Sequence, residues 1–272
     1  MIGPYRVLEG EDEQAVIDLL TTLIPTLNCA GTIDRWEKGW QENLEAFRKS
    51  GDVADLRPKY IRKHQPLRLN GEFIRARDPD AEAKWYEQFF AGIADKWLAG
   101  HDRIFEFGCG SCHNVAWLAK HFPKAHIYGL DWAQSTMEIV NELRLHGIAV
   151  GGEERFDFFK PTSSYNVAGA AIFTVGALEQ TGLRWRPFLD WLRKMKPAIC
   201  VHIEPFVEWY DSANPVDRTA IAAHDARGFL RDFAPVLTFL HDQGVVEILH
   251  QERTGFGSLW IEGYSQLIWR PL

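Results

Sequence analysis

The sequence lacks any run of apolar residues long enough to span a bilayer, although 46% of its 272 residues are hydrophobic. It also lacks a surplus of positive charge, because 30 Lys and Arg stand against 37 Asp and Glu, a net charge of -7 at pH 7. A general nucleic-acid-binding protein would present a basic surface. These absences favour a small-molecule partner over nucleic acid or membrane, and self-association as a homodimer is left open.

Cysteine is scarce, with four residues in the chain, and the start MIGPYRVLEGEDEQ lacks the basic-then-apolar pattern of a secretory signal. We therefore expect reduced thiols and a cytoplasmic protein. The run Cys109-Gly-Ser-Cys112-His113 matches patterns for covalent haem and for redox dithiols. Haem attachment requires export, and the pair lies in a glycine turn with another use, so we reject both. Cys29 and Cys200 add no metal-ligand spacing.

The stretch from Arg103 to Gln134 has the pattern strand, glycine turn, helix, strand. An apolar run predicts a buried parallel strand that ends at Gly108 and Gly110, where glycines permit a tight turn and close approach of a ligand. Residues 126–130 predict the next strand, with Asp131 at its carboxyl end. Since ligands bind beyond the carboxyl ends of parallel strands, the turn and Asp131 should border one crevice.

Two ligand classes fit this pattern. A dinucleotide fingerprint requires a third glycine, where this chain has a histidine. The order Glu106-x-Gly108-x-Gly110, followed one strand later by Asp131, resembles motif I and the acidic residue after it in class I S-adenosylmethionine-dependent methyltransferases. The similarity extends from about Asp102 to the C-terminus. It implies that the glycines lie against the methionyl part of the cofactor, that Glu106 helps to hold its ammonium group, and that Asp131 binds both ribose hydroxyls.

The resemblance also implies an α/β, Rossmann-like fold. It consists of a mostly parallel seven-stranded sheet with an antiparallel last strand, helices on both faces and an N-terminal helical lid. A strand near Arg155 to Phe159 would place Asp157 to accept a hydrogen bond from the adenine amino group and Phe158 against the ring. A turn carboxylate is the alternative for Asp157. Trp132 would flank the adenine, and Thr174 on the next strand is a further expected cofactor contact.

Catalytic groups are expected after the fourth and fifth strands. The segment Gly176 to Gln180 is similar to one that carries E-x-x-E-H in metal-binding family members, but this chain lacks the first glutamate and the histidine, so we predict no metal. Glu179 is a candidate for orienting a substrate hydroxyl or amine, with a helix-start carboxylate as the equal alternative. His202 and Glu204 alternate along one strand face and are candidate bases. A buried histidine bonded to a neighbour is the commoner situation.

Residues 1–100 differ in pattern from residues 101–272, which we take as the cofactor-binding core. Apolar residues at helical spacing predict helices at residues 11–24, 34–50 and 79–99. We interpret this extension as a lid over the substrate, because methyl transfer benefits from exclusion of water.

The stretch from residue 57 to 77 is broken by proline and rich in Lys and Arg. A solvated loop is the plain interpretation. The functional one is an anion clamp, in which Arg62 and Arg68, with Tyr60 beside them, hold a carboxylate or phosphate of the cofactor or substrate.

The C-terminal part predicts a long helix at about residues 219–241, kinked at a proline, and then a closing hairpin with strands at 245–251 and 264–270. In the resembling family the hairpin supplies the sixth strand and the antiparallel seventh strand. Its loop should lie on the substrate side, which makes Arg253 and Trp260 candidate substrate contacts.

The leading hypothesis is transfer of a methyl group from S-adenosylmethionine to oxygen or nitrogen of a small metabolite, such as a sugar or a secondary-metabolite intermediate. The alternatives are an NAD(P)-dependent oxidoreductase with a Rossmann domain and a non-catalytic partner that shares the fold. Methylation of nucleic acid is disfavoured, because strand four ends in Thr-Val-Gly-Ala and lacks an Asn/Asp-Pro-Pro-aromatic motif.

Overall fold

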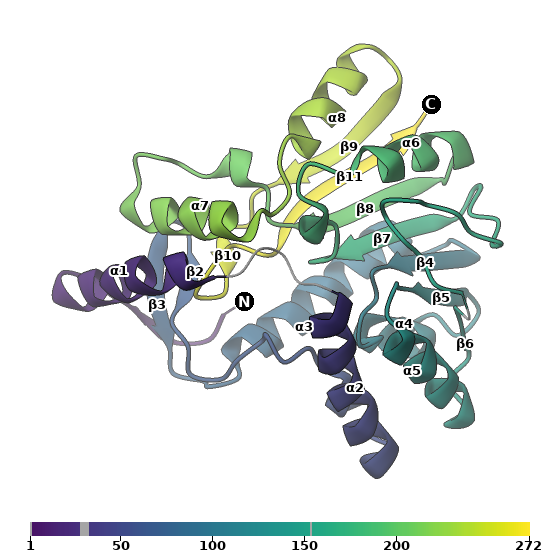
Figure 1. The fold of residues 1–272 in the computed structure, drawn as a ribbon, viewed down its shortest axis with the longest axis horizontal. Coiled ribbons are helices and arrows are strands. Elements are labelled where there is room, and N and C mark those ends of the chain that lie inside the picture. Colours follow the sequence, from purple (N-terminus) through teal and green to yellow (C-terminus); the bar gives the residue numbers. More distant parts are fainter. Residues whose placement is uncertain (1, 28–32, 153) are drawn as a thin grey trace.

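The computed structural model of the chain describes residues 2–27, 33–152 and 154–272, so Cys29 lies outside the described residues. Within these ranges, a seven-stranded sheet has the strand order β6-β5-β4-β7-β8-β11-β9 (Figure 1). Strands β4 to β8 pair in parallel, and β11 is antiparallel to both of its neighbours. The predicted fold class is confirmed. The strands are β4 (Arg103–Phe107), β5 (His126–Leu130), β6 (Val150–Gly151), β7 (Ala171–Val175), β8 (Ile199–Glu204), β9 (Val246–Glu252) and β11 (Ser265–Pro271).

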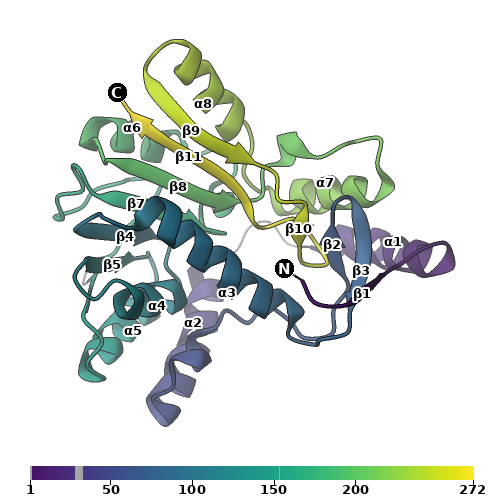
Figure 2. The ribbon, with the colours of Figure 1, turned by 180° about the vertical axis from the view of Figure 1, so that it is seen from behind.

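Helices cover both faces of this sheet because successive strand residues point to opposite sides. Ile104 and Phe173 pack into the core on one face, and Phe105 packs into the core on the other. Figure 2 shows α3 crossing the first face. The helices of that face are α3 (Ala81–Ile93) with its continuation η3 (Ala94–Leu98), α4 (His113–His121) and α5 (Gln134–Leu145). The helices of the other face are α6 (Arg186–Met195) and α8 (Phe233–Asp242).

A second, smaller unit lies beside the carboxyl ends of the parallel strands (Figures 1 and 2). Among the described residues it is a four-stranded antiparallel sheet in the order β1-β3-β2-β10, with a small core of its own between α1, β3 and α7. The helices were predicted, but the three N-terminal strands were not. Its elements are β1 (Tyr5–Val7), α1 (Glu11–Leu23), η1 (Ile24–Thr26), β2 (Leu67–Leu69), β3 (Glu72–Ala76), α7 (Pro215–Arg227) and β10 (Phe256–Gly257).

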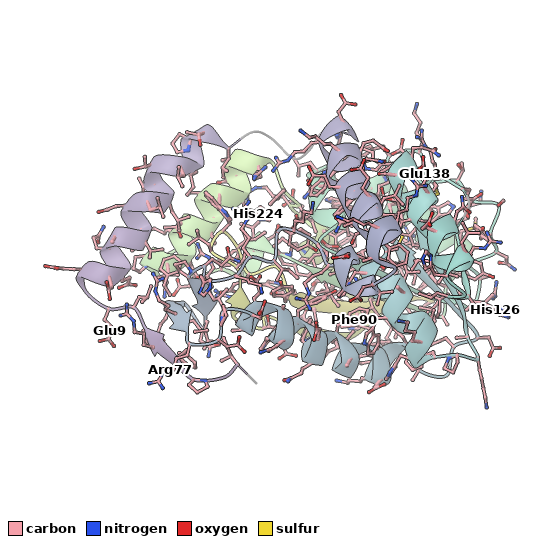
Figure 3. The ribbon with its side chains drawn as sticks, turned by 90° about the horizontal axis from the view of Figure 1, so that it is seen from below. Glu9, Arg77, Phe90, His126, Glu138 and His224 are labelled. Atoms are coloured by element: carbon pink, nitrogen blue, oxygen red, sulfur yellow. The ribbon has the colours of Figure 1, made fainter. Side chains whose placement is uncertain are left out.

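Helix α2 (Ile33–Ser50) is bound to α5 by its own side chains, and η2 (Val53–Leu56) follows it. Leu44 and Phe47 enter the core, while Arg48 makes ion pairs with Glu138 at 3.3 Å and Glu142 at 3.1 Å. Figure 3 labels Glu138 on α5 beside α2, and places Glu9 and Arg77 at the opposite end of the molecule. Helix α2 therefore packs against α5, on the β6-β5-β4 side of the large sheet.

Two local predictions are wrong. The predicted strand at 155–159 is a loop whose sole described pairing is a bridge between Asp131 and Arg155, because Phe156 leaves the sheet to pack among aromatic rings. The single long helix at 219–241 is two helices, α7 and α8, since Gly228 and Asp232 take left-handed conformations with φ of 64° and 65°. The remaining short turns of helix are η4 (Leu178–Thr181) and η5 (Val207–Trp209). No helix in the described ranges is long and apolar enough to cross a membrane.

Candidate functional site

The turn after β4 can be formed only by glycine. Gly108 and Gly110 have φ of 74° and 50°. A Cβ atom on Gly108 would lie 2.3 Å from the Cβ of Ala177, and one on Gly110 would lie 2.6 Å from the ring of Trp40. Positive φ and lack of space both exclude a side chain. The turn therefore presents bare backbone to the space above it.

That space is a cavity, here called the glycine-loop cavity. Seven of the residues that line it are residues that the sequence assigned to the cofactor, and they come from three places: β4 and its turn, the end of β5 and the loop after β6. The seven are Glu106, Gly108, Gly110, Asp131, Trp132, Asp157 and Phe158.

Glu106 is a buried carboxyl group with one free oxygen. It is 2% exposed, and its Oε1 accepts a 2.7 Å hydrogen bond from Asn114 Nδ2, whose own Oδ1 accepts one from Tyr86. Its Oε2 is buried and has no partner among the described residues. Burial raises the pKa of Glu106 to about 8, against the lowering effect of the Asn114 bond. A cationic group at Oε2 would complete the bonding of this carboxylate.

Asp131 connects the second strand to the glycine turn. Its Oδ2 accepts from the backbone N of Gly110 at 3.0 Å, and its Oδ1 accepts from that of Ala133 at 2.9 Å. Burial raises the pKa of Asp131 to about 6, although these bonds oppose the shift. Each carboxylate oxygen has a second lone pair, so Asp131 retains acceptor capacity toward hydroxyl groups in the cavity.

A second cavity adjoins the first, and is here called the arginine cavity. The two share five lining residues: Trp36, Tyr60, Val175, Gly176 and Gln180. Four residues predicted for substrate or catalysis line the arginine cavity: Tyr60, Arg62, Glu179 and Trp260. Burial and the charge of Glu204 raise the pKa of Glu179 well above its ordinary value. The shared residues form a common rim that joins the two cavities.

Two arginines expected at the substrate are structural. Arg68 is fully buried in the small sheet, where it donates to the carbonyl of Val216, the carbonyl of Leu259 and the hydroxyl of Thr219. Arg253 makes ion pairs with Asp217 and Glu262 at 2.7 Å. Neither is among the described residues that line the two cavities. A buried guanidinium needs several acceptors, and these interactions use the donors that an anion clamp would require.

Three polar residues on β7 and β8 are also not among the described residues that line the two cavities: Thr174, His202 and Glu204. His202 is fully buried, bonds to Thr174 Oγ1 through Nδ1 at 2.9 Å and contacts the ring of Phe233. Burial lowers the pKa of His202 to about 3, which keeps it neutral and makes it unsuitable as the base. Thr174 therefore binds His202 and does not line the glycine-loop cavity.

Glu204 holds the segment after β7 in place. Its carboxylate accepts from the backbone N of Ala177, Leu178 and Glu179 at 3.0 to 3.2 Å. This binding satisfies the first N–H groups of η4, as a cap does for a helix. Glu204 thus positions the rim residues and is a positioning group, not the base that the sequence suggested.

Several site residues were missed by sequence reasoning. Trp36 and Trp40 were predicted only as part of the helix at 34–50, but their rings stack with centroids 5.3 Å apart and line the glycine-loop cavity. The carboxylate of Glu37 on the same helix accepts from the backbone N of Gln134 and Ser135, both at 2.7 Å. No sequence signal links Glu37 to its partners, which lie 97 and 98 positions away. Asn114, which orients Glu106, follows the turn directly and could have been found by its spacing.

The cysteine pair in the turn is buried, and its sulfur atoms lie 3.7 Å apart. Burial raises the pKa of the Cys109 thiol well above its ordinary value. In the described part of the chain, no group of three or more His, Cys, Asp or Glu residues is arranged to hold a metal ion.

No protein-family model and no curated protein matches the sequence. Solved structures match the fold at low identity. They include the N,N-8-amino-8-demethyl-D-riboflavin dimethyltransferase of Streptomyces davawensis, with 14% identity, a TM-score of 0.50, and coverage of 71% of this chain and 56% of that one. An O-methyltransferase from neocarzinostatin biosynthesis, in complex with S-adenosylmethionine and 2-hydroxy-5-methyl naphthoic acid, has 16% identity, a TM-score of 0.50, and coverage of 70% and 55%.

A candidate sarcosine dimethylglycine methyltransferase of Galdieria sulphuraria has 13% identity, a TM-score of 0.51, and coverage of 70% of this chain and 86% of that one. The chain spans a little over half the length of the two enzymes above. At these identities the likeness shows the fold.

Proposed function

We propose that this chain, whose fold is that of class I S-adenosylmethionine-dependent methyltransferases, transfers a methyl group from S-adenosylmethionine to oxygen or nitrogen of a small molecule. The unpartnered, buried Oε2 of Glu106 carries the proposal. It lines a cavity beside a backbone turn without side chains, where the α-ammonium group of S-adenosylmethionine would supply the missing partner.

The other lining residues fit the same cofactor. Gly108 and Gly110 leave room for the methionyl backbone, and the free lone pairs of Asp131 suit the ribose hydroxyls. Asp157 and Phe158, with Trp132, offer a carboxylate and two aromatic faces for adenine. A dinucleotide would place a pyrophosphate at the turn, next to the carboxyl group of Glu106, and the repulsion disfavours that alternative.

When bound, S-adenosylmethionine supplies a methyl group on an activated sulfonium. The residues of this chain then orient the acceptor and manage its proton. The acceptor atom would lie at the rim shared by the two cavities, near Tyr60, Gly176 and Gln180. Glu179 is next to this rim, and burial favours the protonated form of its carboxyl group, so it is our candidate for orienting the acceptor and holding its proton.

The lid role of residues 1–100 belongs to this proposal. Its support is that Trp36 and Trp40 of α2 and Tyr60 of the following loop line the glycine-loop cavity directly. These side chains would exclude water from the sulfonium and strengthen each polar contact around it.

Calorimetric titration with S-adenosylmethionine, S-adenosylhomocysteine and NAD in parallel tests the proposal. We expect the first two to bind and NAD not to bind. Asp131→Ala should weaken S-adenosylmethionine binding by roughly 2–4 kcal/mol, the scale for truncating one side of a desolvated charged hydrogen bond. Binding of NAD alone, binding of none of the three, or unchanged S-adenosylmethionine affinity in a folded Asp131→Ala variant would each contradict it.

A further inference from the structure

Three arginines line the arginine cavity: Arg35 on α2, Arg62 in the loop after η2 and Arg227 on α7. Two of them, Arg35 and Arg62, make no hydrogen bond or ion pair with any residue that the structure describes. Arg48 and Arg253, by contrast, have carboxylate partners. The guanidinium groups of Arg35 and Arg62 are therefore available to a ligand.

Two of these cations lie close enough to repel each other. Burial lowers the pKa of Arg227, the charge of Arg35 lowers it further, and the charge of Glu179 acts in the opposite direction. Like charges that face one cavity repel each other while the cavity holds no ligand, and an anion bound between them would reduce this repulsion. Guanidinium groups bind planar oxyanions such as carboxylates with two parallel hydrogen bonds.

The acidic residues of the same cavity do not offer a matching site for a cation. Glu82 accepts from Gln65 at 2.6 Å and from Tyr264 at 3.0 Å, so both of its carboxylate oxygens have donors. Glu179 accepts from Gln180 at 2.6 Å. Positive charge therefore predominates among the polar groups left for a ligand.

Aromatic rings form much of the remaining wall. Trp36, Tyr60, Phe229, Trp260 and Tyr264 line the cavity, and they come from four separate segments of the chain. Rings from several directions favour a flat, apolar body, which they contact by stacking and by edge-to-face packing.

We propose that the arginine cavity binds an aromatic acid, a planar aromatic body with a carboxylate held by Arg62 and Arg35, as the methyl acceptor. This inference rests on the proposed function, because the shared rim must bring the acceptor to the cofactor. A cationic amine is disfavoured as the acceptor, since it would enter a cavity whose unpaired charges are positive.

The test uses the full chain saturated with S-adenosylhomocysteine and measures its affinity for four probes. All four carry a naphthalene ring: 2-naphthoate, neutral 2-naphthalenemethanol, cationic 2-naphthylmethylamine and 2-naphthyl phosphate. We expect 2-naphthoate to bind about tenfold or more tightly than the alcohol, the scale of a charge-assisted hydrogen bond, and the amine to bind most weakly. Equal binding of acid and alcohol, or preference for the amine, overturns the inference. Tighter binding of the phosphate ester than of the naphthoate overturns the assignment to a carboxylate.

Variants separate charge recognition from loss of structure. Arg62→Met should reduce 2-naphthoate affinity about tenfold and leave the affinity for the alcohol within about twofold, because only the charge-assisted bonds are removed. Arg35→Met should act in the same direction. Arg193→Met is the matched control, since Arg193 is on the far helix α6 and pairs with Asp190. Equal losses for acid and alcohol would overturn the inference.

The two proposals fail separately. If S-adenosylhomocysteine does not bind, the proposed function is wrong. The affinities of the four probes, measured without S-adenosylhomocysteine, then still show whether the arginine cavity prefers an aromatic acid. If S-adenosylhomocysteine binds and the naphthoate shows no preference, only the inference about the acceptor is lost.

Discussion

Glu37 is the contact through which α2 is held over the glycine turn, and its removal tests whether that helix belongs to the cofactor site. The carboxylate accepts from two successive N–H groups at the start of α5, Gln134 and Ser135, both at 2.7 Å. Helix α5 has no side-chain cap of its own at Ala133, so Glu37 performs this function from another element. The same helix presents Trp36 and Trp40 to the cavity.

The expected cost follows from these two bonds. Loss of a helix cap costs about 0.5–2 kcal/mol, and loss of a negative charge at a helix N-terminus costs about 0.3–1 kcal/mol. Glu37→Ala should therefore weaken docking of α2 by about 1–3 kcal/mol. If the docked helix is the binding-competent state, S-adenosylhomocysteine affinity should fall by about 5- to 150-fold, since about 1.4 kcal/mol is a factor of ten.

The assay is calorimetric titration with S-adenosylhomocysteine, combined with thermal unfolding of the same samples. Glu45→Ala is the matched control, because Glu45 is exposed on the same helix and bonds to Gln41 within it. We expect the control to bind as the wild type does. Wild-type affinity in Glu37→Ala, or an equal loss in Glu45→Ala, would refute the reasoning.

Four further predictions concern burial, charge and packing. Arg68→Met should lower the free energy of unfolding by at least about 2 kcal/mol, because two carbonyl groups lose their donors. The affinity of the folded variant for S-adenosylhomocysteine should stay within twofold of the wild-type value. Denaturant unfolding and calorimetric titration check these two results. Because the pKa of Glu106 is raised to about 8, its carboxyl group is largely protonated at neutral pH, and binding of an ammonium should release a proton. Affinity should therefore rise from about pH 5.5 to 7.0, where an α-amino group with a pKa of about 7.7–8.0 stays mostly charged, and Glu106→Gln should abolish the release seen in buffers of different ionisation enthalpy. The raised pKa also means that Glu106 stabilises the ligand-free fold at low pH and loses this effect as pH rises through 8, so Glu106→Gln should unfold at higher temperature than wild type at pH 8. A truncated chain starting at His101 should aggregate or bind cofactor weakly, because α3 packs on Phe173 of the large sheet; a soluble, active core would contradict this.

Sequence reasoning was reliable where function and fold share one local pattern. Glu106, Gly108, Gly110 and Asp131 lie within one strand-turn-helix-strand unit, and the topology of parallel strands brings their groups to one crevice. The prediction needed no knowledge of distant packing. The same holds for strands β9 and β11, whose ends lie within one residue of those predicted at 245–251 and 264–270.

Sequence reasoning failed where the surroundings of a side chain depend on partners far along the chain. An arginine in a proline-broken stretch has the same local sequence whether it lines a cavity, as Arg62 does, or is buried, as Arg68 is. Only the acceptors from α7 and from the loop before β11 decide between these cases. His202 was misjudged for a related reason, since alternation along a strand shows which residues share a face and not whether that face is open.

The small sheet joins the beginning of the chain to its last segment, because β10 lies between β9 and β11 and pairs with β2. Arg68 and the Leu259 carbonyl that it binds are 191 positions apart. During synthesis on the ribosome, β2 therefore has an unpaired edge until nearly the whole chain has emerged, while β4 and β5 can pair much earlier. Long-range pairing of this kind slows folding, and an exposed strand edge favours association with other chains. We therefore expect the arginine cavity, whose wall includes Trp260 and Tyr264, to form after the glycine turn in a nascent chain.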